Sequence, residues 1–313
     1  MDRIINYTDL TKAIDKAYNE QKNNNAGTIP EKLGNRNAGK FGISMILADG
    51  RRYNAGDTDT RFTLGSLADL PILAQLFSQK PVEEVMNKMG GCGCACNQAN
   101  KEVKETLKKQ HAHLRGLREL SMVEPTGDID AKMDIMSTTL YNLTGAAPVM
   151  DDDLYKARMD EIRANDTVNE LAAADYFLYD DAALTLDAYA RLHSMQVTTE
   201  QLANMGATIA ADGVNPSTGA NVFDGENSAP LIASMAAKGP HKMRRQWLAI
   251  TGVPAVCSFG GGFLAVVPGV GAFAAFSPEL NEALIPVKAA LALKSIFTSL
   301  QINAFGSARI VVK

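Results

Sequence analysis

A long run without charged side chains limits what this chain can fold into. No Asp, Glu, Lys or Arg occurs between Arg245 and Glu279. A membrane-spanning helix needs about 20 apolar residues that hold a continuous helix, but three consecutive glycines and then Pro268-Gly269 interrupt this run. The run therefore predicts two buried strands, roughly 261–267 and 271–277, joined by a turn at Pro268-Gly269. No membrane span is expected.

Composition and charge argue against several classes of function. The 313 residues include 31 Lys and Arg against 35 Asp and Glu, a formal net charge of −4, which gives no reason to expect a nucleic-acid partner. Four cysteines in this length do not make a disulfide framework. The N-terminal segment has no uninterrupted apolar stretch of the kind found in signal peptides. We therefore expect a cytoplasmic protein that binds neither nucleic acid nor membrane.

Strand patterns occur near both ends of the chain. Asp49-Gly50 separates the runs Phe41–Leu47 and Arg51–Asn54, and this dipeptide is a strong signal for a β-hairpin. Together with the two strands in the C-terminal third, the hairpin predicts one antiparallel sheet formed by both chain ends, an α+β fold. We expect the strand near 257–267 to lie next to the strand that follows Asp57–Arg61.

Helical patterns fill most of the remaining chain. Apolar residues recur at helical spacing over Tyr7–Gln21 and predict an N-terminal amphipathic helix. Further helices are predicted over 71–79, 101–120, 131–143, 152–164, 169–177, 184–193, 199–211 and 286–300. This order of patterns predicts a sheet-containing domain from 1–70 and 200–313, with a mainly helical domain, 71–199, inserted between its two halves.

The C-terminal third contains the most distinctive sequence. Its motifs are LANMGAT at 202–208, DGVNPSTG at 212–219 and GGGFLAVVPG at 260–269. In these motifs, and in the order and spacing of the hairpin region, the chain resembles the bacterial glutaminase family over about 40–80 and 150–305. The resemblance fails across roughly 88–125. It implies a serine β-lactamase/transpeptidase-like fold, an α/β/α sandwich, and the hydrolysis of L-glutamine to L-glutamate and ammonia.

The resemblance places Ser66 at the position of the family's nucleophile. In that family the serine belongs to an S-x-x-K motif, in which a neutral lysine amine takes the hydroxyl proton. Here the fourth residue is Asp69, and an exposed Asp with a pKa near ~3.9 is a poor base for a hydroxyl. The same spacing is also a helix-capping pattern. Pro71 favours a helix capped by Asp69, which would move Ser66 off the family geometry.

Other site positions that the resemblance implies are only partly retained. The second lysine of the family is here Val256, and its catalytic tyrosine is His241, a residue that titrates near neutral pH and so could act as acid or base. The carboxamide that binds the substrate is missing at Leu114. Asn169 matches a substrate-holding asparagine, and Tyr189 matches the family's helix tyrosine. Both stay as candidate remnants of the site.

Three closely spaced thiols form a second candidate site. Cys92, Cys94 and Cys96 are separated by small residues, so they could converge on a soft metal ion, with His111 and His113 completing the ligand set. The spacing is not the familiar C-x-x-C, and a glycine-rich loop or a reversible disulfide explains it as well. No cofactor is otherwise expected.

These observations predict a glutaminase-like protein that has lost glutamine hydrolysis. Residues that work as one catalytic unit lose nearly all activity when a key member is removed. We therefore expect a binding, scaffold or regulatory role, with a small amino-acid-like ligand and a homo-oligomer or protein partner. The alternatives are an active serine amidohydrolase that uses Ser66 with Asp69 or His241, and a thiol or metal protein. An enzyme of the family would need lysines at Asp69 and Val256.

Overall fold

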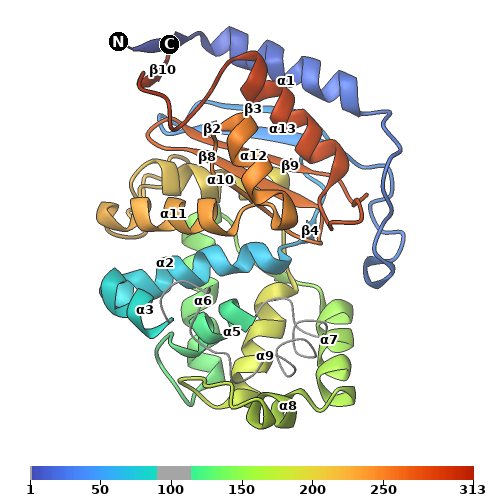
Figure 1. Ribbon diagram of the computed structural model, residues 1–313, viewed down its shortest axis with the longest axis vertical. Coiled ribbons are helices and arrows are strands. Elements are labelled where there is room, and N and C mark those ends of the chain that lie inside the picture. The colour runs from blue at the N-terminus through green and yellow to red at the C-terminus, as the bar shows by residue number, and fades with distance from the viewer. Residues whose placement is uncertain (1, 90–113) are drawn as a thin grey trace.

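The computed structural model describes residues 2–89 and 114–313, and a five-stranded sheet lies at its centre (Figure 1). All of its strand pairs are antiparallel, and both chain ends contribute strands, as predicted. In spatial order the strands are β3 (Arg52–Gly56), β2 (Gly42–Leu47), β9 (Gly271–Phe276), β8 (Gly262–Val267) and β7 (Ala255–Cys257). The charge-free run thus forms β7, β8 and β9, with the predicted turn at Pro268-Gly269 between the last two.

Side chains of the central strands alternate between two hydrophobic cores. In β8, Phe263, Ala265 and Val267 face one core, while Leu264 and Val266 face the other. This alternation with period two is what a strand buried on both faces requires. The helices on the first face are α1 (Tyr7–Gln21), α12 (Arg244–Thr251) and α13 (Val287–Ser299), and α10 (Thr199–Ala210) packs on the second. The α/β/α layering is confirmed.

One predicted strand neighbour is wrong. The strand after Asp57–Arg61 is β4 (Phe62–Thr63), and it pairs with β6 (Met195–Val197), which also pairs with β5 (Val149–Met150). Both edges of β8 are already taken by β7 and β9. The glycine turn before β8 packs against β4 without forming a ladder. The chain ends form a separate parallel pair, β1 (Arg3–Ile5) with β10 (Ile310–Val312).

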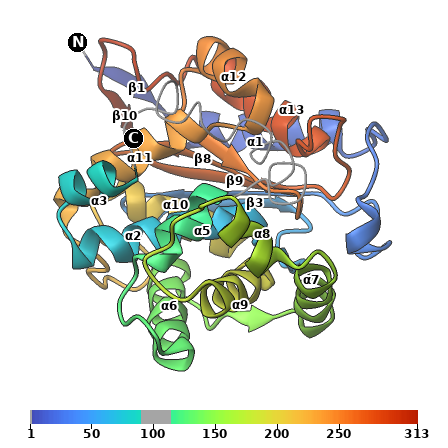
Figure 2. The same ribbon diagram turned by 60° about the horizontal axis from the view of Figure 1, so that its bottom comes forward.

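The remaining helices lie mostly on one side of the sheet (Figures 1 and 2). They are α2 (Asp69–Gln79), α3 (Val82–Lys88), α5 (Leu114–Ser121), α6 (Ile129–Thr144), α7 (Asp152–Ala164), α8 (Thr167–Ala173), α9 (Ala182–His193) and α11 (Ser228–Lys238). Short 3₁₀ turns occur at Glu31–Leu33, Gly65–Ala68, Gly225–Asn227 and His241–Met243. Among the described residues, no helix is both long and apolar enough to cross a membrane. The predicted domain boundaries stay a prediction.

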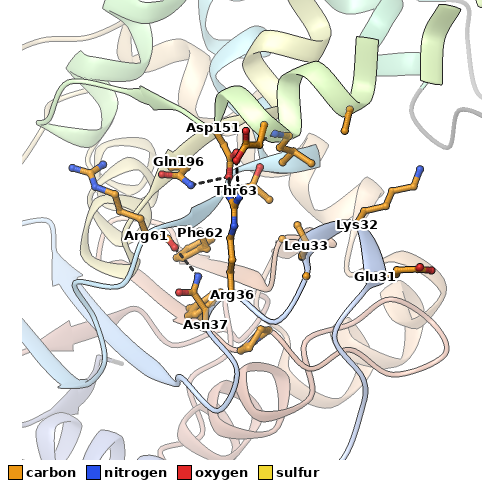
Figure 3. A pocket seen from close by; sticks show the side chains of 17 residues that line it. Glu31, Lys32, Leu33, Arg36, Asn37, Arg61, Phe62, Thr63, Asp151 and Gln196 are labelled. Carbon is orange, nitrogen blue, oxygen red and sulfur yellow. Dashed lines mark hydrogen bonds and ion pairs between the residues drawn. The ribbon is translucent and has the colours of Figure 1, made fainter. Parts of the chain in front are cut away.

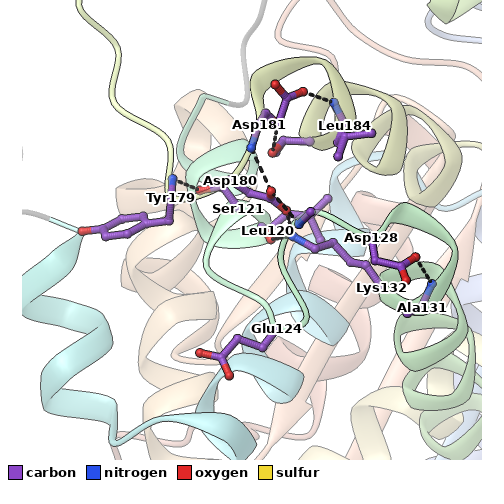
Figure 4. A network of polar contacts seen from close by, with 12 residues as sticks. Leu120, Ser121, Glu124, Asp128, Ala131, Lys132, Tyr179, Asp180, Asp181 and Leu184 are labelled. Carbon is purple, nitrogen blue, oxygen red and sulfur yellow. Dashed lines mark hydrogen bonds and ion pairs between the residues drawn. The ribbon is translucent and has the colours of Figure 1, made fainter.

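A buried ion pair fixes the helices that carry part of the candidate site (Figure 4). Lys132 of α6 lies 2.6 Å from Asp180, and the two side chains are 2% and 4% exposed. Asp180 also accepts the backbone N–H of Asp181, whose own carboxylate caps α9. Ser121, at the end of α5, accepts a backbone N–H from the same segment. The network therefore holds α5, α6 and the start of α9 together.

Candidate functional site

Ser66 lies in a buried 3₁₀ turn that leads from β4 into α2. Its side chain is 1% exposed, and its hydroxyl donates to the backbone carbonyl of Cys257 in β7 at 3.3 Å. Gly65 has a positive φ of 54°, and a Cβ at this residue would lie 2.9 Å from the ring of Phe259. A glycine is therefore required just before Ser66. The turn is pressed between β7 and the segment that follows it.

Asp69 begins α2, but its side chain does not cap the helix. The N-cap position is Ala68, and no side chain bonds the first turn, so the predicted cap is wrong, although Pro71 does lie in the first turn. The Asp69 carboxylate faces Lys238 instead, whose ammonium lies 2.5 Å from Oδ2. A cap needs a carboxylate aimed at the first backbone N–H groups, and the ion pair directs this one elsewhere.

Lys238 brings a lysine to the Ser66 turn from another element. It is the last residue of α11, and its Nζ donates both to Asp69 and, at 2.7 Å, to the backbone carbonyl of Ser66. Lys238 was not predicted from the sequence, because the resemblance implies lysines only at positions 69 and 256. The available signal was a lysine directly before Gly239-Pro240-His241, the segment aligned with a family site.

Two aromatic side chains of α9 contact the other oxygen of Asp69. The Tyr189 hydroxyl donates to Oδ1 at 3.3 Å, and Nε2 of His193 lies 3.9 Å from the same oxygen. Burial lowers the pKa of His193 to about 4 and raises the pKa of Tyr189 well above its usual value. Both groups are therefore neutral near pH 7. The structure brings Tyr189 to Asp69, three residues after Ser66, and the catalytic roles expected for Ser66 and Tyr189 stay predictions.

A second acid lies behind Asp69 on α5. Gly116 packs so closely that a Cβ there would lie 2.4 Å from Oδ1 of Asp69 and 2.6 Å from the Tyr189 hydroxyl. One turn later, the buried Glu119 carboxylate accepts from Nε of Arg115 at 2.8 Å. Burial, and then the nearby Asp69, raise the pKa of Glu119 to about 7. Leu114, the position without a carboxamide, begins this helix.

Arg158 of α7 reaches the site from the other side. Its guanidinium carbon lies 5.0 Å from the ring centroid of Phe259, whose ring touches the Ser66 turn. Burial lowers the pKa of Arg158. Nε of Arg158 is buried and has no hydrogen-bond partner among the described residues. No local sequence signal marks Arg158, because it lies in an ordinary amphipathic helix far from the family motifs.

The remaining predicted positions contribute less. Val256 is a buried core residue of β7, so this strand supplies no cation. His241 has a positive φ of 50°, and burial, followed by the charge of Lys238, lowers its pKa. Asn169 is exposed on α8, where its amide donates to Asp166 at 2.9 Å. The roles proposed for His241 and Asn169 stay predictions.

The thiol site cannot be placed in this structure. Cys92, Cys94 and Cys96 lie outside the described residues, as do His111 and His113. Within residues 2–89 and 114–313, no three His, Cys, Asp or Glu side chains form a group that could hold a metal ion. The metal, disulfide and loop interpretations of the three thiols therefore stay open.

A pocket of about 330 Å³ lies beside the Ser66 turn (Figure 3). Its wall includes Thr63 of β4, but the Ser66 side chain does not line it. Arg36 crosses the wall and pairs at 2.9 Å with both Asp151 and Asp153 at the start of α7. Gln196 also donates to Asp151. Because the charges of Arg36 and the two aspartates neutralise one another, these ion pairs mainly hold the N-terminal loop against α7.

Comparisons with known proteins agree with this geometry. A family model described as Glutaminase matches residues 24–305. A glutaminase of Bacteroides thetaiotaomicron is 33% identical, covering 100% of this chain and 99% of that protein. Glutaminase 1 of Escherichia coli O157:H7 is 30% identical, covering 95% and 97%.

Solved structures show the same fold. A probable glutaminase, ybaS, superposes with a TM-score of 0.85 and 27% identity, covering 97% of this chain and 100% of that one. Mglu in its glutamate form has a TM-score of 0.80 and 23% identity, covering 95% and 70%. The similarity to Mglu carries the fold alone. Together these matches support the β-lactamase-like arrangement expected from the sequence.

Proposed function

The chain belongs to the glutaminase family, and from the site described above we propose that it binds a small amino-acid-like ligand without hydrolysing L-glutamine at an enzymatic rate. The observation that carries the proposal is the ion pair between Asp69 and Lys238, 2.5 Å apart, beside Ser66. It puts a carboxylate where the family motif has its lysine.

The first argument concerns activation of the serine. A hydroxyl becomes a nucleophile when an adjacent base accepts its proton. The Ser66 hydroxyl donates to a backbone carbonyl, and such an oxygen does not take a proton in this chemistry. Lys238 meets the backbone oxygen of Ser66 and the Asp69 carboxylate. Neither of these contacts is with the Ser66 hydroxyl, so Lys238 is not positioned to take the proton of the serine.

The second argument concerns the transition state. Amide hydrolysis develops negative charge on the substrate oxygen, and enzymes stabilise it with hydrogen-bond donors or cations. Asp69 places a carboxylate next to Ser66, and Glu119 lies behind it. Lys238 offsets one negative charge, but its nearest partners already use two of its three N–H donors. The site is therefore poorly suited to stabilise an oxyanion.

The nature of the ligand follows from the fold and family. Mglu has been solved in a glutamate form, and we carry this class of ligand over to the present chain as part of the proposal. The proposed role is therefore binding, with a scaffold or regulatory consequence. A cytoplasmic location and a homo-oligomeric or partner-bound state belong to the same proposal, and light scattering of the purified protein tests the second.

One observation favours a second candidate, an altered serine amidohydrolase. Lys238 supplies an amine within 2.7 Å of the Ser66 backbone, so a substrate that displaced it from Asp69 would bring a free amine near the nucleophile. This alternative uses Ser66 as the nucleophile and Lys238 in place of the lysine that is missing from position 69.

A glutamine-hydrolysis assay separates the two candidates. We expect ammonia release from L-glutamine by the purified protein to equal that of the Ser66→Ala variant, because loss of a general base alone costs about 10²–10⁴-fold. Asp69→Lys alone should not restore activity, since the new ammonium would face Lys238. Ammonia release that depends on Ser66 would contradict the proposal and support the amidohydrolase.

A further inference from the structure

Arg158 is a half-buried cation that has no acidic partner among the residues the structure describes. Its Nε is inaccessible and makes no hydrogen bond, and no carboxylate lies within ion-pair distance in the part of the chain that the structure describes. Arg163, one turn further along α7, is exposed and pairs with Asp160 at 3.3 Å. Arginines are rarely buried unless they are paired. Arg158 therefore requires an explanation that Arg163 does not.

Three acids of the helices around the site are each held by another cation. Asp69 is held by Lys238 at 2.5 Å. Glu119 is held by Arg115 at 2.8 Å, and Glu161, on the same helix as Arg158, is held by Lys32 at 2.7 Å. Arg158 is therefore left without an ion pair within the described residues, although the charge of Glu161 still acts on it at longer range.

The position of Arg158 points to the Ser66 site. Its guanidinium lies over Phe259, and the ring of Phe259 touches Gly65, next to Ser66. The charges of Arg158 and Lys238 both disfavour protonation of His193, so the two cations act on the same region. A cation over an aromatic face is attracted by the ring. This contact offsets part of the desolvation cost but satisfies no N–H donor.

We propose that Arg158 is the carboxylate-binding residue of the Ser66 site and that its ligand is a small amino acid with a free carboxylate. The proposal rests on the binding function proposed above. A guanidinium presents a planar pair of N–H donors that matches a carboxylate in two parallel hydrogen bonds. The ligand thus supplies the anion that the protein itself withholds from Arg158.

Binding measurements on matched arginine variants test this assignment. The probes are L-glutamate, its side-chain amide L-glutamine and its α-amide L-isoglutamine, titrated by calorimetry. Wild type should bind L-glutamate, and Arg158→Met should weaken that binding by about 10- to 100-fold, the effect of losing a charged hydrogen-bond pair. Arg163→Met should bind as wild type does. One of the two amides lacks the carboxylate that Arg158 binds, and wild type should bind that amide more weakly than L-glutamate. The Arg158→Met variant should bind that amide and L-glutamate with equal affinity.

The stability of the unliganded variants separates binding from a structural role. Met keeps the apolar contact with Phe259 but removes a desolvated charge, so unliganded Arg158→Met should melt at the same temperature as wild type or higher. A clearly lower melting temperature would show a structural role and overturn the assignment.

The two proposals fail in different ways. Equal binding of L-glutamate by wild type and Arg158→Met would overturn the assignment of Arg158 and leave the binding function standing. If wild type binds none of the three amino acids at millimolar concentration, the binding function itself is overturned, and the assignment with it.

Discussion

Asp69 and Lys238 show how a single replaced residue is stabilised in a buried position. A carboxylate that is 9% exposed carries a large desolvation cost unless a cation and hydrogen bonds compensate it. Lys238 and the Tyr189 hydroxyl supply that compensation. Because Lys238 also holds the Ser66 carbonyl, the pair fixes the turn that carries the serine. The carboxylate that stands where the family motif has its lysine is thus part of the local structure.

This pair predicts strong coupling in a double-mutant cycle. Lys238→Met should cost roughly 2 kcal/mol of unfolding free energy, between the values typical of exposed and buried pairs, because it leaves Asp69 without its cation. Asp69→Asn/Lys238→Met should cost less than Lys238→Met alone. Urea unfolding of the four proteins measures the cycle. Additive effects of the two single changes would show that the ion pair contributes no coupling.

At the scale of elements, α5 places a titratable carboxyl against α2. The close approach at Gly116 brings Glu119 under Asp69, and burial raises the pKa of Glu119 from 4.5 to about 7. Its contribution to stability is full below pH 4.5 and is lost as the pH rises through 7. His193 of α9 acts in the opposite direction. Its pKa falls from 6.5 to about 4, so its contribution is full above pH 6.5 and is lost as the pH falls through 4.

The two opposing groups predict a pH dependence that one substitution exposes. Between pH 4.5 and 6.5 the contributions of Glu119 and His193 partly cancel. As the pH rises through this range, the unfolding free energy of Glu119→Gln should therefore increase more steeply than that of wild type. The difference in slope is at most about 1.4 kcal/mol per pH unit. Urea unfolding at several pH values measures it. The control is Glu124→Gln, since Lys80 lowers the pKa of the exposed Glu124 and so moves its titration below this range. Parallel curves for wild type and Glu119→Gln would contradict the assignment.

The elements also show what local sequence could and could not reveal. The helix over Tyr7–Gln21 and the hairpin at Asp49-Gly50 were predicted correctly because their signals are local: periodicity and turn chemistry. The spacing Ser66-x-x-Asp69 was ambiguous, since a helix cap and a buried ion pair use the same residue types. The ion pair depends on Lys238, which is far away in sequence.

The same limit explains the rest of the candidate site. Ser66 and Tyr189 were named as candidates because the family motifs carry them. Arg158 and Glu119 were not, because their roles come from burial and from which neighbours are already paired. The wrong neighbour for β4 has a similar cause. The order of strands along the chain indicates which strands could be neighbours. Which strands actually pair depends on the hydrogen bonds between them, and these are seen only in the structure.

At the scale of the whole molecule, one hydrophobic core joins the sheet to the inserted helices. The core includes Ile46 of β2 and Leu264 of β8 together with Leu73 of α2 and Leu143 of α6. Helix α10 contacts both the sheet and α6, so it lies at the centre of this core. Helices that share their core with the sheet cannot lose their packing alone without exposing apolar surface on both.

The shared core predicts a single cooperative unfolding transition. Trp247 is the chain's one tryptophan, and it lies in the core on the other face of the sheet. Its ring centroid is 4.7 Å from that of Phe263 in β8, so its fluorescence reports on the packing of the sheet. Far-UV circular dichroism reports mainly the helices. The two urea midpoints should coincide, and Leu143→Ala, costing about 2–5 kcal/mol, should lower both midpoints equally. Separate midpoints, or a shift in the dichroism midpoint alone, would show that the inserted helices unfold as an independent domain.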